Sequence, residues 1–182
     1  MVVPAAELSR RSVVAPLNVV SPATPVVQTK TFITHDWTID ALGRDNHERA
    51  TRLNEALKRD GVNTWFDSDR MTGSIRDKMA EGIVNTSSVI VCITKNYMSK
   101  TNGLELSDNC KFELDYAFRK HGSTKFIPVV MEPGMRNPND WGDGAASAML
   151  GGMLYIDMCS DEPAAFEAAV RQLVAAIDTV TK

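Results

Sequence analysis

The chain has 182 residues, of which 43% are hydrophobic and 24% are charged, and its formal net charge is −3. These values are typical of one globular domain with some additional chain. The small negative charge does not favour nucleic-acid binding, and no apolar run is long enough to span a membrane, so neither nucleic acid nor a membrane is an expected partner.

The cysteines are few and widely spaced: Cys92, Cys110 and Cys159. An odd number of isolated cysteines indicates small buried thiols in a reducing compartment rather than a disulfide framework. No Cys/His pair has the spacing of a zinc site. We therefore expect a cytoplasmic protein without a metal site.

Residues 1–30 differ in composition from the rest of the chain. Val, Ala, Ser, Thr and Pro dominate, and neither a helical nor a strand period persists. This composition predicts a disordered leader over residues 1–30 and a folded domain over residues 31–182.

Strands and helices then alternate. Short apolar runs predict strands at 31–34, 62–66, 89–93, 125–131 and 153–157. Capping residues and apolar stripes predict helices that begin at Asp45, at Ser74, within the stretch Ser107–Leu114 and at Pro163. In the second helix we expect Ile75, Met79 and Ile83 on the buried face. We expect a flexible connection at 99–106 and a long loop at 132–152.

Strict alternation predicts an α/β fold, with a five-stranded parallel sheet and helices on both faces. Ligands of such sheets bind at the carboxyl ends of the strands. Function is therefore expected in the four loops at that edge: 35–44, 67–73, 94–109 and 132–152.

Several chemistries of this architecture do not match the chain. A receiver domain needs an acceptor Asp after the third strand, where this chain has Thr94 and Lys95. The first loop has one glycine, Gly43, and so lacks the G-x-G-x-x-G of a dinucleotide-binding fold. The flavodoxin phosphate loop and the G-x-S-x-G elbow of α/β-hydrolases are also absent.

Five motifs occur in the order found in one family. They are Phe32-Ile33-Thr34-His35, the run from Leu53 to Asp67, Asp69-Arg70-Met71-Thr72-Gly73, Thr94-Lys95-Asn96-Tyr97 and Cys110-Lys111-Phe112-Glu113-Leu114. Together they resemble the Toll/interleukin-1 receptor (TIR) domain family of flavodoxin-like fold, with motifs similar to plant and NAD-cleaving members. The resemblance covers about residues 30–180.

The resemblance implies an activity and a catalytic residue. Many TIR domains cleave the nicotinamide–ribose bond of NAD+ when self-associated, and an essential Glu of those enzymes matches Glu113. NAD would then be the substrate, with no further cofactor. A carboxylate beside the ribose suits the oxocarbenium character of such a reaction. An acid near a helix start is otherwise a solvated residue that complements the helix dipole.

The resemblance also implies a binding cleft built from His35, Asp36, Trp37, Arg44 and Thr72. Trp37 would provide a flat surface for adenine or nicotinamide, or alternatively cap the core. Asp36 and Trp37 stand where many NAD-cleaving members have arginines, and Arg44 is the candidate to supply that charge. Cys110 is expected to pack rather than to act as a nucleophile.

Two other functions remain open from the sequence. The loop Asp67–Gly73 resembles the BB loop, through which TIR domains contact each other, and a TIR domain without catalysis would be an adaptor in signalling or innate immunity. A related fold that processes nucleosides would also use a Glu on an N-glycosidic bond.

Overall fold

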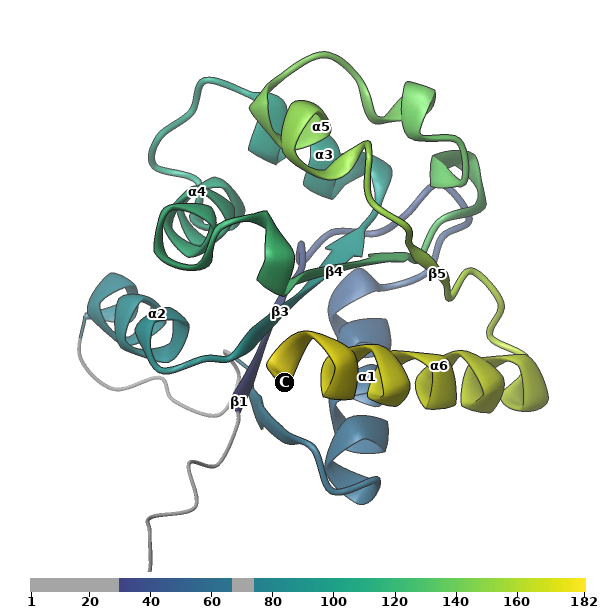
Figure 1. The fold of residues 1–182 in the computed structure, drawn as a ribbon. Coiled ribbons are helices and arrows are strands. Elements are labelled where there is room, and N and C mark those ends of the chain that lie inside the picture. Colours follow the sequence, from purple (N-terminus) through teal and green to yellow (C-terminus); the bar gives the residue numbers. More distant parts are fainter. Residues whose placement is uncertain (1–29, 67–73) are drawn as a thin grey trace, which may run out of the picture.

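The computed structural model describes residues 30–66 and 74–182 (Figure 1). The strands are β1 (Lys30–Thr34), β2 (Asn63–Trp65), β3 (Ser88–Ile93), β4 (Phe126–Val130) and β5 (Ile156–Asp157). The α-helices are α1 (Asn46–Arg59), α2 (Ile75–Val84), α3 (Lys95–Asn102), α4 (Asn109–His121), α5 (Ala145–Leu150) and α6 (Pro163–Thr181). Lys30, placed in the leader by the sequence, is the first residue of β1, and the rest of the predicted leader lies outside the described residues.

The strands form one parallel sheet with the order β2-β1-β3-β4-β5. The chain runs outward from β1 to β2, then returns to the other side of β1 with β3, which creates a switch point between β1 and β3. All six residues of β3 are buried, as expected for a strand covered on both faces. The predicted α/β fold with a five-stranded parallel sheet is confirmed.

Two apolar cores lie on opposite faces of the sheet, and Figure 1 shows the helices that cover each face. Alternate residues of β3 point to different cores, with Val89 and Val91 in one and Ile90 and Cys92 in the other. Helices α1 and α6 cover the second core, and α2, α3, α4 and α5 cover the first. The helices that carry the candidate site therefore rest on a sheet that is closed from both sides.

Local hydrogen bonds fix three helix starts: the predicted caps Asp45 and Ser74 are present, and Asp108 caps the helix predicted to start within Ser107–Leu114. Asp45 accepts from the backbone N–H of Glu48, and Ser74 accepts from that of Asp77. Asp108 accepts from two backbone N–H groups of the first turn of α4. Each cap satisfies amides that have no partner within the helix, so the start of each helix is fixed by its own sequence.

Pro128 lies inside β4 without interrupting the sheet. The backbone N–H of Met131 donates to Ile93 in β3, whereas the carbonyl of Val130 accepts from Met158 on the β5 side. Because bonding directions alternate along a strand, the nitrogen of Pro128 faces the β5 side, and β5 pairs only from Val129 onward. The missing donor therefore costs no ladder bond.

Three local expectations were wrong. Residues 95–102 form helix α3, which is capped by the Thr94 side chain. The sequence predicted no helix here and a flexible connection from Ser99 onward. The long loop at 132–152 contains the short helix α5 and two 3₁₀ turns. Ile75 is 49% exposed, because the buried face of α2 is made by Met79, Gly82 and Ile83 instead.

Gly82 gives a test of this packing. A Cβ at this position would lie 2.5 Å from the Trp65 ring, which itself stacks on Phe32. Gly82→Ala is expected to lower the free energy of unfolding by about 1–3 kcal/mol, because the new methyl overlaps the Trp65 ring and forces it off its stacked contact with Phe32. Urea denaturation measures the change. Gly134→Ala is the control, because its new methyl would meet no atom within 4 Å, and equal losses in both variants would contradict the argument.

Candidate functional site

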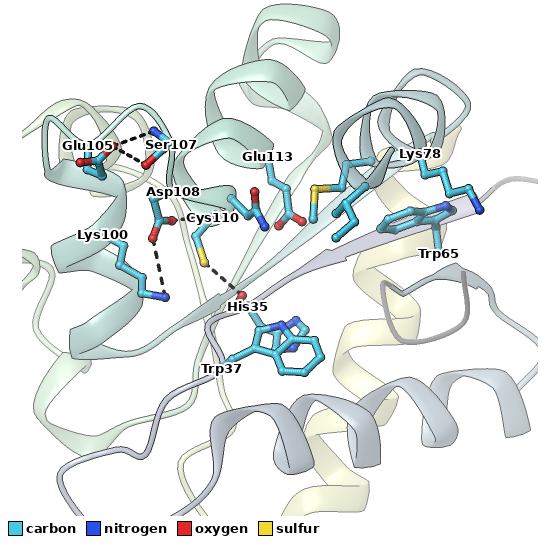
Figure 2. A pocket seen from close by; sticks show the side chains of 13 residues that line it. His35, Trp37, Trp65, Lys78, Lys100, Glu105, Ser107, Asp108, Cys110 and Glu113 are labelled. Atoms are coloured by element: carbon cyan, nitrogen blue, oxygen red, sulfur yellow. Dashed lines mark hydrogen bonds and ion pairs between the residues drawn. The ribbon is translucent and has the colours of Figure 1, made fainter. Parts of the chain in front are cut away.

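A pocket of about 480 Å³ opens at the carboxyl edge of the sheet (Figure 2). This volume falls within the roughly 300–1,000 Å³ of small-molecule sites. Its walls come from the segment after β1, from the last residue of β2 and from α2. The other walls come from α3, from the connection between α3 and α4, and from the first two turns of α4. The lining residues are His35, Trp37, Trp65, Ile75, Lys78, Met79, Lys100, Glu105, Ser107, Asp108, Asn109, Cys110 and Glu113.

Glu113 lies in the pocket wall, in the second turn of α4, and is 5% exposed. Figure 2 shows its carboxylate between the side of the pocket with Asp108 and the side with Trp65. The hydroxyl of Thr34, the last residue of β1, donates to Glu113 Oε2 over 2.6 Å. The Tyr97 hydroxyl lies 3.2 Å from Thr34 Oγ1 and must donate, because threonine has only one hydroxyl proton. The carboxylate is thus positioned by a chain of two hydroxyls.

His35 and Trp37 form another part of the pocket wall, directly after β1. His35 is buried, and Nε2 of its ring lies 2.8 Å from Nδ1 of His47. The pKa of His35 is lowered to about 3, mainly by burial and secondly by the electrostatic effect of His47. Trp37 is 49% exposed and stacks on His47. The structure therefore brings Glu113, His35 and Trp37 together around one pocket.

Asp36 lies outside the pocket lining and is fully buried. Its carboxylate accepts from the backbone N–H and the hydroxyl of Thr38, from the amide of Asn46 and from the hydroxyl of Thr94. These donors come from the loop after β1, the start of α1 and the end of β3. In this structure Asp36 joins three segments rather than facing the pocket.

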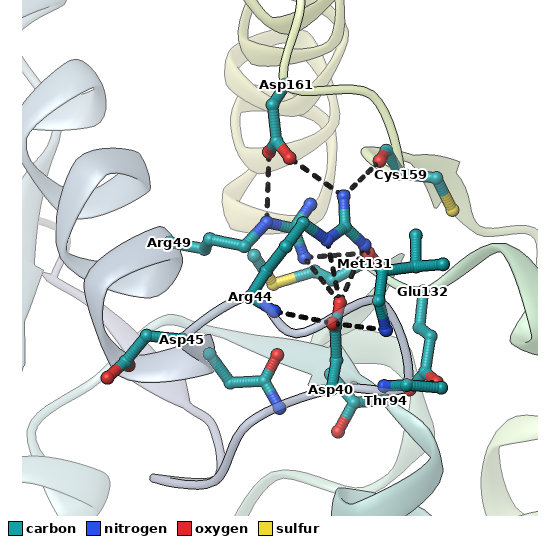
Figure 3. A network of polar contacts seen from close by, with 12 residues as sticks. Asp40, Arg44, Asp45, Arg49, Thr94, Met131, Glu132, Cys159 and Asp161 are labelled. Atoms are coloured by element: carbon teal, nitrogen blue, oxygen red, sulfur yellow. Dashed lines mark hydrogen bonds and ion pairs between the residues drawn. The ribbon is translucent and has the colours of Figure 1, made fainter.

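Arg44 also lies away from the pocket, in a separate polar network (Figure 3). Its guanidinium is 2.7 Å from Asp40 and 2.9 Å from Asp161, and it donates to the carbonyl oxygens of Met131 and Cys159. Burial opposes the ionisation of Asp40, but hydrogen bonds from Arg44 outweigh it and hold the pKa of Asp40 below its usual value. Arg44 therefore links the loop after β1 to Asp161, just before α6, by ion pairs.

The remaining predicted site residue, Thr72, lies outside the described residues, as does the predicted contact loop Asp67–Gly73. Cys110 lines the pocket, and its thiol donates to the carbonyl oxygen of His35 over 3.3 Å. Burial, followed by the charge of Glu113, raises the pKa of Cys110 far above its usual value. Its environment thus favours packing over nucleophilic attack.

Several residues of the site were missed by sequence reasoning. Lys100 lines the pocket, 3.7 Å from Asp108, because α3 carries it to the pocket edge. One local signal was present, since Thr94 is a residue type that caps helices, and its side chain accepts from the backbone N–H of Tyr97. Trp65 and Lys78 also line the pocket. His47 supports Trp37 from α1, a contact for which the sequence carries no local signal.

Metal-binding clusters and membrane-spanning helices are absent from residues 30–66 and 74–182. Within these ranges no group of three His, Cys, Asp or Glu side chains is arranged to hold a metal ion. No helix among the described elements has the length and apolar character needed to cross a membrane. The three cysteines are all buried and unpaired with one another.

Comparisons with known proteins agree with this architecture. A model of the TIR domain family matches residues 32–174, and the chain therefore belongs to that family. A solved structure described as a prokaryotic SEFIR domain superposes with a TM-score of 0.56 at 17% identity, covering 82% of this chain and 98% of that one. That similarity supports the fold alone. No curated protein matches the chain.

Family membership confirms the resemblance found in the sequence. It places the chain among signalling domains, which generally self-associate. The roles of Glu113 and of the predicted binding residues stay predictions.

The unusual environment of His35 predicts a specific pH dependence. Above pH 6.5 the ring is neutral in both the folded and the unfolded chain, so it contributes nothing there. As pH falls from 6.5 towards about 3, only the unfolded chain takes up the proton, and the free energy of unfolding falls by up to about 1.4 kcal/mol per pH unit.

Urea denaturation of the wild type and of His35→Gln between pH 7 and about pH 5 measures this slope, above the range in which most carboxylates titrate. The variant is expected to lose the wild-type slope over that interval. An identical slope in both proteins would show that His35 takes up a proton in the folded state as readily as in the unfolded state.

Proposed function

We propose that this TIR domain cleaves the bond between nicotinamide and ribose in NAD+ when it is self-associated, with Glu113 as the catalytic carboxylate. The observation that carries the proposal is the position of Glu113: a buried carboxylate in the wall of a pocket, oriented by Thr34 and sharing that pocket with the exposed ring of Trp37. A pocket with one oriented acid and one aromatic wall suits a nucleotide with a ribose and a planar base.

The reaction consumes water and balances without a cofactor. NAD+ and water give ADP-ribose, nicotinamide and one proton, as the C–N bond to the ribose breaks and a C–O bond from water forms. In a cyclising form of the reaction, a nitrogen of the adenine attacks the ribose in place of water. Nicotinamide leaves as a neutral molecule, so no strong acid is needed on the leaving group.

Glu113 would act on the ribose. As the C–N bond lengthens, positive charge moves from the nicotinamide ring onto the ribose, which gains oxocarbenium character. A carboxylate at the ribose stabilises that charge and accepts hydrogen bonds from the sugar hydroxyls. The Thr34 hydroxyl holds Oε2 in place before the substrate arrives, so little reorganisation is needed during the reaction.

Glu113→Gln tests the assignment. The change keeps the shape of the side chain but removes its charge, so nicotinamide release is expected to fall by at least about 100-fold. Concentrated protein, or protein held on a multivalent support, is incubated with NAD+ and the products are separated by chromatography. Asp115→Asn is the matched control, because Asp115 lies two residues further along α4, pairs with Lys111 and lies outside the pocket lining.

Equal release by the wild type and Glu113→Gln would reject Glu113 as the catalytic residue. An absence of release by the wild type in every self-associated form would favour the adaptor function instead. Cleavage of free nucleosides in place of NAD+ would favour a nucleoside-processing enzyme.

Thr34 gives a second test, directed at orientation rather than charge. Thr34→Val keeps the volume but removes the donor to Glu113 and the acceptor for Tyr97. We expect kcat to fall by about 10-fold or more with little change in KM, because a hydrogen bond to a charged group contributes about 1.5–3 kcal/mol. Thr34→Ser restores the hydroxyl and is expected to recover most of the rate. A loss seen equally in Thr34→Ser would show that packing, and not the hydrogen bond, is what matters.

A further inference from the structure

Four nearly parallel aromatic rings connect the core to the pocket. Phe66 is buried, and its ring lies 4.9 Å from that of His35 and 5.7 Å from that of His47, with angles of 20° and 11° between the ring planes. The Trp37 ring lies 3.8 Å from that of His47, at an angle of 16°. The two imidazoles therefore contact a core ring and also the ring that reaches the pocket.

The two imidazoles lie side by side rather than face to face. Nε2 of His35 and Nδ1 of His47 are 2.8 Å apart, while the ring centres are 5.1 Å apart, which is the geometry of a hydrogen bond between ring edges. His35 is held in turn by its position directly after β1 and by its burial. The hydrogen bond thus fixes the rotation of His47, which comes from a different element, α1.

Trp37 needs such support, because 49% of its surface is exposed. Its backbone is fixed on either side, by the buried Asp36 and by the N–H of Thr38, which donates to that carboxylate. Fixing the backbone leaves the two side-chain torsions of Trp37. The close parallel contact with His47 covers one face of the indole and so selects its orientation.

We propose that His47 is a positioning residue of this pocket, which holds the Trp37 indole as a flat wall on which a planar nitrogen-containing ring of the ligand stacks. His47 lies outside the pocket lining, and it contacts two residues that line the pocket, Trp37 by stacking and His35 by a hydrogen bond. The inference deepens the proposed function, since it assigns the base-binding part of the same site, but it concerns binding and does not require that cleavage occurs.

The physical effect is preorganisation. An indole already fixed in its binding orientation loses little conformational freedom when a ligand stacks on it, whereas a free one must be ordered at the moment of binding. Removal of the supporting ring is therefore expected to weaken binding of a base by about 3- to 10-fold. In catalysis the same loss raises KM and leaves kcat nearly unchanged, because the base stacks equally in the ground state and the transition state.

The test combines NMR spectroscopy with ligand titration. The three indole N–H resonances belong to Trp37, Trp65 and Trp141, and Trp37→Phe assigns the first. In His47→Ala the Trp37 resonance is expected to shift and broaden, while that of the buried Trp141, which donates to the carbonyl oxygen of Met135, stays in place. Titration with ADP-ribose and with nicotinamide shows which ring stacks on Trp37. The Kd of the ligand that binds is expected to be 3- to 10-fold higher for His47→Ala than for the wild type.

Two further variants separate stacking from folding. His47→Phe keeps a flat ring beneath Trp37 but loses the hydrogen bond, and it is expected to retain more of the affinity than His47→Ala. If His47→Ala does not fold, His47→Leu replaces it, because leucine keeps the volume without a flat ring. Glu55→Ala, an exposed position on the same helix, is the control and is expected to leave the resonance and Kd unchanged.

An unchanged Trp37 resonance in His47→Ala, an unchanged Kd, or no binding of either ligand to the wild type would overturn the proposal. If the wild type binds ADP-ribose or nicotinamide and His47→Ala weakens that binding, the proposal holds even where NAD+ is not cleaved, and then only the proposed activity has failed.

Discussion

The carboxylate of Asp36, which has no exposure to solvent, is the constraint on which the site depends. A buried carboxylate is costly unless donors surround it, and here the donors come from Thr38, Asn46 and Thr94. Those donors belong to the loop after β1, the start of α1 and the end of β3. Because the charge requires all of them, the three segments have one mutual arrangement. His35 and Trp37, the two predicted binding residues on either side of Asp36, take their positions from this arrangement.

This constraint also explains how the charges are distributed. A basic residue in place of Asp36 would face the same donors and leave them without an acceptor. The cation further along the loop, Arg44, is engaged by Asp40 and Asp161, which tie the loop to the chain just before α6 (Figure 3). The loop after β1 is therefore built to be rigid, and its contribution to the pocket is aromatic rather than basic. The cations in the pocket lining come instead from α2 and α3, as Lys78 and Lys100.

The sequence was sufficient where the determining interactions are local. The caps at Asp45, Ser74 and Asp108 lie within three residues of the amides they satisfy, so three helix starts could be predicted. The five strands and their parallel pairing followed from strict alternation. Distant contacts could not be predicted. Asp36 is buried by a partner 58 residues away, and Arg44 pairs with an acid 117 residues away. Helix α3 was missed because its polar residues conceal a short buried stripe at Tyr97, Met98 and Thr101.

Within the proposed reaction, the two sides of the pocket have different tasks. The nicotinamide ring of NAD+ is positively charged before cleavage and neutral after it, while the ribose gains positive charge only in the transition state. A carboxylate beside the ring would stabilise the substrate and slow the reaction, whereas one beside the ribose stabilises the transition state. Glu113 on α4 and the aromatic wall after β1 come from separate elements of the same pocket, so the base can stack on Trp37 while the carboxylate addresses the sugar. In the proposed reaction, catalysis would therefore depend on the separation of these two groups as much as on the presence of either.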